Sequence, residues 1–359
     1  MSATPLVSEP KPESELVVQE IGEQGLLRRL QSYCPPEMVG DDAAVLSLPP
    51  DQDLVVTTDV LVDGVHFSLG LALPQQTTSP TDVGWRAIAA NLSDLAAMGA
   101  RPVGLTIGLS LPGTVPVAWL EALYQGMAAC AAAYGTAIVG GDICRSPVVT
   151  LGITALGQVH PQRVLRRSAA QVGDAIVVTG EHGASRAGLE RLLSPDDPCS
   201  LTVSQQQRLI QAHQRPRPRL DVLSYLAAAG VWQLDRPIAA MDSSDGLADA
   251  VLQICQASGV GALLERSRLP TPPEVAQWQS AEQALNWTLY GGEDFELVLC
   301  LPEAIAPAFV AQCPGAAIIG YTTSALDVVV GDRSHPGESQ PRDASYLSLQ
   351  QGFQHFDEA

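Results

Sequence analysis

The spacing of apolar residues along the chain changes repeatedly between a helical and a strand pattern. Short runs rich in β-branched residues indicate strands, and longer runs with apolar residues three and four positions apart indicate helices. In the first half, helices are expected at 16–31, 81–98 and 116–134, and strands at 53–58, 103–109, 136–139 and 148–158. Pro80 and Thr81 are typical of a helix start, and Gly99 is typical of a helix end.

The second half of the chain repeats the same alternation. Helices are expected at 184–193, 219–229 and 246–258, and strands at 175–179, 238–241, 262–264, 295–301 and 316–321. The segments 195–218 and 331–345 follow neither spacing and are expected to be loops. Because both halves mix helices with strands, the pattern predicts an α+β (mixed α/β) fold of two domains.

Length and local composition indicate where the domains lie. A chain of 359 residues is typical of two domains. The first 15 residues are rich in Pro, Glu and Ser and predict a disordered tail. The polar stretch 160–172 is typical of a boundary, so we expect an N-terminal domain at 16–165 and a C-terminal domain at 166–359.

The charge of the chain excludes several classes of function. With 20 Lys and Arg against 39 Asp and Glu, the formal net charge is −19, which argues against nucleic-acid binding and against attraction to anionic lipid. Lys11, in the polar tail, is the only lysine of the sequence. This excludes a P-loop, a protein-kinase site and a lysine Schiff base, since each needs a lysine at its centre.

Cysteine usage and hydropathy indicate a cytoplasmic protein. The seven cysteines form no Cys-x-x-Cys pair and their number is odd, so reduced thiols are expected. The N-terminal segment lacks the basic and apolar regions of a signal peptide. We expect no membrane-spanning segment, because Gly and polar residues interrupt the longest apolar stretches.

Acidic residues recur at strand ends and in glycine-bounded turns. These are Asp41, Asp42, Asp59, Asp94, Asp142, Asp242, Asp245, Glu293 and Asp294. Carboxylates that converge repel one another unless a cation lies between them, and oxygen ligands without His or Cys favour Mg²⁺ and a phosphorylated substrate. The alternative is that each one caps a helix or forms a turn, which Asp also favours.

Six ordered segments carry a family resemblance. They are GDDAAVL (40–46), TTDVLVDGVHF (57–67), NLSDLAAMGARP (91–102), GGDICRSP (140–147), DSSDGLADA (242–250) and YGGEDFELVL (290–299). Together they resemble the thiamine-monophosphate kinase family, which belongs to the ATP-binding superfamily of aminoimidazole ribonucleotide synthetase. The resemblance implies an N-terminal domain that donates strands to a homodimer and binds ATP and Mg²⁺, and a C-terminal α/β domain that completes the site.

The family resemblance also implies a reaction. The γ-phosphoryl group of ATP passes directly to thiamine monophosphate, giving thiamine diphosphate in the final step of its biosynthesis. The nucleophile is an already ionised phosphate oxygen, so no general base is expected and several Mg²⁺ ions would offset the charge. The alternatives are another ATP-dependent synthetase of the superfamily and a nucleotide-binding regulator without catalysis.

The resemblance implies roles only for those residues of this sequence that match the motifs of the family. The implied Mg²⁺ ligands are Asp42, Thr57, Thr58, Asp59, Asp94, Asp142, Asp242 and Asp245. The implied ATP contacts are Tyr124, Gly141, Asp142, Arg167 and Ser244. The implied substrate contacts are His66, Glu293 and Phe353. Without the resemblance, His66 is interpreted as a structural hydrogen-bonding side chain and Phe353 as a core aromatic.

Overall fold

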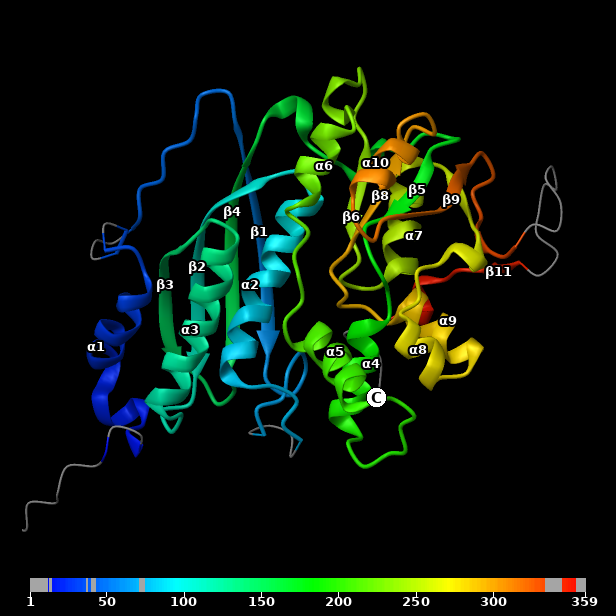
Figure 1. Cartoon of the computed structure of the whole chain (residues 1–359). Coiled ribbons are helices and arrows are strands. Elements are labelled where there is room, and N and C mark those ends of the chain that lie inside the picture. Colours follow the sequence, from blue (N-terminus) through cyan, green and yellow to red (C-terminus); the bar gives the residue numbers. More distant parts are fainter. Residues whose placement is uncertain are drawn as a thin grey trace, which may run out of the picture.

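The fold consists of two mixed halves, each built on its own sheet (Figure 1). The computed structural model describes residues 12, 15–36, 38–39, 43–70, 75–332 and 344–352. The first sheet has four strands in the order β1-β4-β2-β3, namely β1 (Asp53–Val62), β4 (Thr150–Val159), β2 (Arg101–Leu111) and β3 (Ile138–Arg145). Strand β4 runs antiparallel to β1 and β2, whereas β3 runs parallel to β2.

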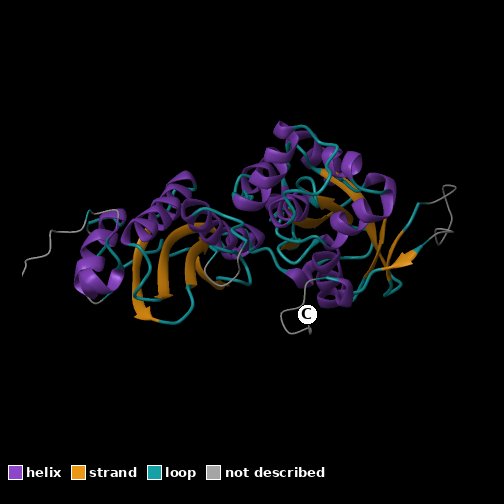
Figure 2. Cartoon of the chain, turned by 90° about the horizontal axis from the view of Figure 1, so that it is seen from below, coloured by secondary structure: helices purple, strands orange, loops and turns teal. Residues whose placement is uncertain are grey.

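Two helices cover one face of this first sheet and a third lies beside them, against α3, as Figure 1 and Figure 2 show. The covering helices are α2 (Pro80–Ala97) and α3 (Val117–Ala133), and the helix beside them is α1 (Val18–Leu30). Helices α2 and α3 approach closely because glycines lie at their contact: a Cβ on Gly84 would lie 2.1 Å from the Leu123 carbonyl oxygen, and one on Gly126 would lie 1.9 Å from that of Thr81. On strand β1, Leu54, Val56 and Val60 stay 53, 55 and 51% exposed.

The second sheet has seven strands in the order β11-β10-β7-β9-β5-β8-β6. They are β5 (Ala175–Val178), β6 (Ala239–Asp242), β7 (Gly261–Leu264), β8 (Leu297–Leu301), β9 (Ala317–Thr323), β10 (Val328–Val330) and β11 (Ser345–Tyr346). Every residue of the inner strands β5 and β8 is buried. Strands buried on both faces form continuous apolar runs, which is how the sequence revealed these two.

Two cores flank the second sheet, and alternate residues of its strands face each one. Ile176, Val298 and Cys300 pack in the core that contains α7 (Leu247–Ser258). Val177, Leu297 and Leu299 pack in the core that contains α6 (Val222–Ala228) and α10 (Ala306–Gln312). The other helices of this half are α4 (Ala184–Leu193), α5 (Val203–Gln214), α8 (Pro273–Trp278) and α9 (Ala281–Tyr290).

The structure confirms the expected α+β class and corrects part of the sequence prediction. The stretch 195–218, expected to be a loop, contains α5, which a capping box between Thr202 and Gln205 begins. The spacing of apolar residues did not predict α5, because only a narrow stripe of this helix, including Leu209 and His213, is buried. Helices α8, α9 and α10 and strands β10 and β11 were not predicted. The segment 333–343 and most of the expected tail lie outside the described residues.

The proposed division after residue 165 falls between the two sheets, and it stays a prediction. Strand β4 ends at Val159 and β5 begins at Ala175. Leu165 itself packs with residues of the second half. Within the described ranges, no helix is long and apolar enough to cross a membrane.

Candidate active site

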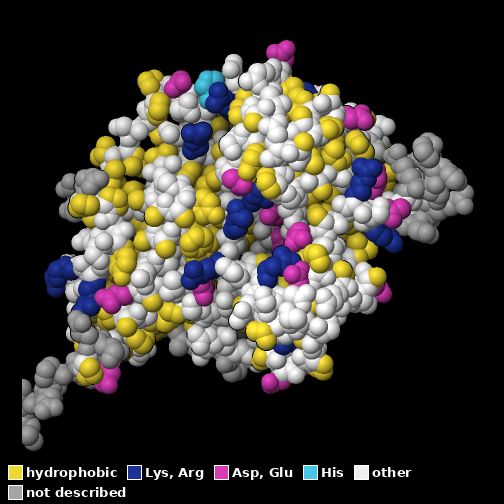
Figure 3. Space-filling model, viewed as in Figure 1, with side chains coloured by type: hydrophobic (Ala, Val, Ile, Leu, Met, Phe, Trp, Pro, Cys, Tyr) yellow, Lys and Arg dark blue, Asp and Glu magenta, His cyan; other side chains and the backbone are white. Residues whose placement is uncertain are grey.

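A cleft with a volume of about 1150 Å³ lies between the two halves of the chain. The N-terminal half lines it with β1, the turn that follows β1, and α2. The C-terminal half lines it with α4, α5, α9, the turn after β6, and the segment that follows α9. Figure 3 shows acidic and basic side chains next to one another in the middle of the molecule, where the two halves meet.

Carboxylates from three different elements meet at one end of the cleft. Asp59 lies on β1, Asp94 on α2 and Asp242 at the end of β6. The backbone N–H of Asp59 donates to Asn91 Oδ1 at 3.2 Å, and Ser93 Oγ donates to Asp242 Oδ2 at 2.7 Å. Helix α2 therefore contacts both strands that present the acids.

Hydroxyl groups hold the same carboxylates in place. Thr57 Oγ1 donates to Asp94 Oδ2 at 2.5 Å, and Ser244 Oγ donates to Asp242 Oδ1 at 2.9 Å. Thr58 pairs with Thr154 across the sheet, with 2.9 Å between their hydroxyl oxygens, and also lines the cleft. Asp245, exposed in the turn after β6, completes this group, which we call the acidic end of the cleft.

The acids of this acidic end perturb one another. Burial and the neighbouring carboxylates Asp94 and Asp245 raise the pKa of Asp59 to about 6. Burial and the charge of Asp94 raise the pKa of Asp242 to about 7, against hydrogen bonds from Ser93 and Ser244. Burial also raises the pKa of Asp94, which the Thr57 hydrogen bond and the charge of Arg167 oppose. The group therefore has more negative charge than its side-chain partners offset.

The donor chemistry of the acidic end fits Mg²⁺. Its side chains offer carboxylate and hydroxyl oxygens, the ligands that this ion prefers. In the described part of the chain, no group of three or more His, Cys, Asp and Glu side chains is arranged to hold a metal ion. Oxygens of Asp94 and Asp242 accept hydrogen bonds from Thr57, Ser93 and Ser244 in this arrangement.

Glu293 enters the cleft from a loop with unusual backbone geometry. Gly292, Glu293 and Phe295 have φ angles of 67, 58 and 53°, in the left-handed region that non-glycine residues rarely adopt. The Glu293 N–H donates to the Ser244 carbonyl at 2.7 Å. Asp294 accepts from the N–H groups of Gly183 and Ser185, at 2.6 and 2.9 Å, where α4 begins. These bonds hold the loop in a conformation that its sequence disfavours.

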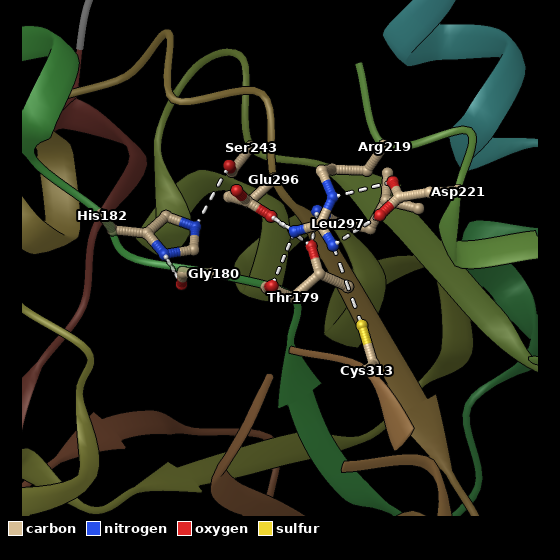
Figure 4. A network of polar contacts seen from close by, with 9 residues as sticks. All are labelled: Thr179, Gly180, His182, Arg219, Asp221, Ser243, Glu296, Leu297 and Cys313. Carbon is tan, nitrogen blue, oxygen red and sulfur yellow. Dashed lines mark hydrogen bonds and ion pairs between the residues drawn. The ribbon is translucent and has the colours of Figure 1, made fainter. Parts of the chain in front are cut away.

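A buried polar network holds Glu296, at the C-terminal end of the same loop (Figure 4). Arg219 forms an ion pair with Glu296 and donates to the Thr179 carbonyl at 2.6 Å, and Asp221 is its second carboxylate partner, at 3.0 Å. Thr179 Oγ1 also donates to Glu296 Oε2, at 2.5 Å. Because each buried polar group here has a partner, the end of the 291–296 segment is rigidly placed.

The remaining predicted residues fall into three groups. His66 lines the cleft and its Nδ1 accepts from the Val62 N–H at 3.1 Å, so the ring is both a structural acceptor and a wall of the site. Arg167 is exposed and donates to Gln253 Oε1 at 2.6 Å, and its charge acts on Asp94. Asp42 and Phe353 lie outside the described residues, although the neighbouring Gly352 lines the cleft.

Thr57 and Arg167 contact or act on Asp94 without lining the cleft themselves, and three further predicted residues lie away from it. Gly141 and Asp142 lie on β3, at the opposite edge of the first sheet from β1, and both are exposed. A Cβ on Gly141 would lie 2.2 Å from the Ile107 carbonyl oxygen, so the glycine serves the pairing of β3 with β2. Tyr124 is buried on α3, with its ring 6.1 Å from that of Tyr33.

Sequence analysis missed several side chains that line the cleft. They are Arg86, Arg186, His213, Asn286 and Trp287. One signal was available: Arg86 is a charged residue four and eight positions before Ala90 and Asp94, on the same row of α2. Asn286, Trp287 and His213 carried no signal, because α9 was not predicted and the segment of His213 was expected to be a loop. Arg186 lies on the predicted helix 184–193, but nothing in the sequence showed that this helix faces the cleft.

Comparison with known proteins identifies the family. The chain is 48% identical to the thiamine-monophosphate kinase of Synechococcus elongatus over 350 residues, which cover 96% of this chain and 99% of the relative. The chain belongs to the thiamine-monophosphate kinase family. The enzyme of that name from Escherichia coli is 40% identical over 74% of this chain and 76% of its own length.

Family models and solved structures agree with membership of the thiamine-monophosphate kinase family. The N-terminal and C-terminal domains of AIR synthase related protein match residues 40–159 and 171–332. The thiamine-monophosphate kinase structure from Stenotrophomonas maltophilia has a TM-score of 0.74 and 31% identity, over 86% of this chain and 96% of that one. The structure of AaThiL complexed with AMPPCP and TMP has a TM-score of 0.68 and 29% identity, over 89 and 97%.

Proposed function

We propose that this protein transfers the γ-phosphoryl group of ATP to thiamine monophosphate, giving thiamine diphosphate and ADP. The observation that carries the proposal is the cleft, in which the acidic end and Glu293 face one space. The structure of AaThiL complexed with AMPPCP and TMP, at 29% identity, supports the choice of both substrates. A volume of about 1150 Å³ also accommodates two phosphate-bearing molecules.

The chemistry requires position and charge more than proton transfer. An oxygen of the acceptor phosphate attacks the γ-phosphorus, and the bond from that phosphorus to the bridging oxygen of ADP breaks. The acceptor oxygen is already ionised near neutral pH, so no side chain has to remove a proton. Mg²⁺, when bound, supplies neutralisation of the phosphate charges.

The acidic end would hold Mg²⁺. The proposed ligands that line the cleft are Thr58, Asp59, Asp94, Asp242 and Asp245. Thr57, which donates to Asp94, and Asp42 belong to the same proposed set. Ser244 and Arg167 lie beside these acids and are proposed to contact ATP. Tyr124, Gly141 and Asp142 stay predictions, because they lie outside the cleft of a single chain.

The substrate end would use His66, Glu293 and Phe353. His66 follows β1 and Glu293 follows α9, so the two halves would contact the acceptor from both sides. Phe353 keeps the role that the resemblance implies.

A direct assay tests the proposed reaction. The purified protein is incubated with ATP, Mg²⁺ and thiamine monophosphate, and thiamine diphosphate is measured by chromatography. We expect product that depends on all three additions. Absence of product, with turnover of an aminoimidazole ribonucleotide precursor instead, would contradict the proposal in favour of a synthetase.

We also propose a homodimer formed through the first sheet. Leu54, Val56 and Val60 project from the outer strand β1 and are more than half exposed. A row of aliphatic side chains on an edge strand is stabilised when a second copy covers it. Light scattering should give twice the chain mass of 37.8 kDa, and Val56→Asp should shift the protein toward the monomer. A monomeric wild type would overturn this proposal.

A further inference from the structure

Arg86 is a buried cation that extends from one half of the molecule to the other. It lies on α2 with its side chain 5% exposed. One guanidinium nitrogen, Nη2, pairs with Glu293 Oε1, and the other, Nη1, donates to His213 Nε2 at 2.8 Å. Both partners belong to the C-terminal half. Burial of a guanidinium has a desolvation cost that a carboxylate partner can fail to offset. Stability alone therefore does not explain this pair, and its position in the cleft points to a role at the substrate site.

His213 fixes the direction in which Arg86 points. Burial and the charges of Arg86 and Arg186 hold the pKa of His213 well below its usual value, so the ring is neutral. Arg86 Nη1 lies 2.8 Å from Nε2 and 3.3 Å from Nδ1 of the ring, and Nδ1 also lies 3.1 Å from Ser185 Oγ. The His213 carbonyl accepts a further bond from Arg86 Nη1 at 3.3 Å. Arg86 is therefore held before any ligand binds.

Glu293 is held in turn by Arg86. Its backbone is fixed in the left-handed region, and its side chain stays 33% exposed in the cleft. Arg86 binds Oε1, whereas Oε2 lies 3.7 Å from His213 Nδ1, longer than a hydrogen bond. The carboxylate thus keeps Oε1 on Arg86, while the Glu293 side chain as a whole stays one-third exposed and lines the cleft.

The same helix sets the distance to the acidic end. Arg86, Ala90 and Asp94 follow one another at intervals of four residues on α2, and all three line the cleft. Eight residues of α-helix span about 12 Å. The small side chain of Ala90 leaves the space between the two charged residues open.

We propose that Arg86 is a positioning residue for the acceptor substrate: it holds the Glu293 carboxylate toward the cleft, at a distance from the acidic end that α2 fixes. The acceptor is a phosphate ester that carries a cationic nitrogen heterocycle, and the carboxylate complements that positive ring. The inference rests on the proposed function, since it takes thiamine monophosphate as the acceptor.

Two substitutions at Arg86 and one matched control test the inference. Arg86→Met removes the guanidinium group, and Arg86→Lys keeps the positive charge but cannot contact Glu293 and His213 with two separate nitrogens. The control is Arg215→Met, which removes the Arg215–Asp82 ion pair. That pair also joins α2 to the end of α5, one helical turn before Arg86, and neither Arg215 nor Asp82 lines the cleft.

The expected result is a selective loss of acceptor binding. Arg86→Met should raise the KM for thiamine monophosphate about tenfold or more, the usual scale for a lost charged hydrogen bond, while the KM for ATP changes less than about twofold. Arg86→Lys should fall between Arg86→Met and wild type. Arg215→Met should leave both KM values near wild type.

A double-mutant cycle separates positioning from a general structural role. If Arg86 acts through Glu293, Arg86→Met should add little to the KM effect of Glu293→Gln. Equal increases in both KM values, or additive effects in the cycle, would overturn the inference. If Arg86→Met does not fold, the same comparison with Arg86→Lys decides. A wild-type protein that forms no thiamine diphosphate overturns the proposed function and this inference together, whereas an active wild type with unselective variants overturns the inference alone.

Discussion

Single side chains in the cleft are placed by partners distant in the sequence. Asp94 accepts from Thr57, Asp242 accepts from Ser93, and Glu293 pairs with Arg86. The first pair joins helix α2 to strand β1 of the same half, and the other two pairs join α2 to the C-terminal half. Removal of one partner therefore alters the placement of an acid as well as a local contact.

At this scale, Asp59→Asn should reduce turnover far more than stability. The substitution removes one negative charge from a group whose carboxylates repel one another, so the melting temperature should stay level or rise slightly. If Asp59 ligates Mg²⁺, kcat should fall by at least about a hundredfold, the scale of losing a group that stabilises the transition state. Near wild-type turnover at saturating Mg²⁺ would contradict the metal assignment.

Asp294 should contribute a pH dependence of stability. Burial raises its pKa to about 7, from 3.8 in the unfolded chain. A raised pKa in the folded state means that the stabilisation is present at low pH and is lost as the pH rises through about 7. Between pH 4 and 8, the free energy of unfolding should therefore fall more for the wild type than for Asp294→Asn, as measured by urea denaturation. Parallel pH profiles for the two proteins would show that Asp294 does not titrate in this way.

Among the elements, those with strong periodicity were predicted well from the sequence. Helix α4 was expected at 184–193 and is Ala184–Leu193, and α2 was expected at 81–98 and is Pro80–Ala97. Both carry clear start signals or a wide apolar face. Helix α5 was missed because its buried stripe is narrow, and the two-residue strand β11 is too short to show a pattern.

The sequence predicted only part of the candidate site, because it shows the motif residues but not the distant side chains that contact them. Ordered motifs located Asp59, Asp94, Asp242 and Glu293, all of which line the cleft. Local spacing contains no information on which distant segments meet. The pairing of Arg86 with Glu293 was therefore invisible until the two halves were placed.

The contact of α2 with α3 gives a prediction at the scale of elements. Gly126→Ala places a methyl group 1.9 Å from the Thr81 carbonyl oxygen, so the helices must separate. We expect a loss of about 2 kcal/mol or more in the free energy of unfolding, the scale of overpacking a core. Equal stability of Gly126→Ala and wild type would show that the helices adjust freely.

The whole molecule is organised around a cleft that neither half forms alone. Strand β1 and helix α2 supply one wall, and α4, α5, α9 and the turn after β6 supply the other. A ligand in the cleft contacts both halves, so its binding energy stabilises their association as well as the folded chain.

Ligand binding should therefore raise the melting temperature of both halves together. With thiamine monophosphate at about 100 times its Kd, the stabilisation should be about 2.7 kcal/mol. Calorimetry should show a shift of the whole transition, and Arg86→Met, if its affinity is about tenfold weaker, should lose about half of that shift at the same ligand concentration. A shift confined to one of two separate transitions would contradict a shared site.

The placement of Arg86 has a consequence for the order in which the chain is made. Its partners His213 and Glu293 are synthesised much later than α2, so during translation this guanidinium has neither of them. A charged side chain without a partner stays hydrated, which keeps the face of α2 that borders the cleft open to water. Arg86 is withdrawn from water only when His213 and Glu293 have both been made, and a chain whose synthesis stops before Glu293 therefore lacks a formed acceptor site.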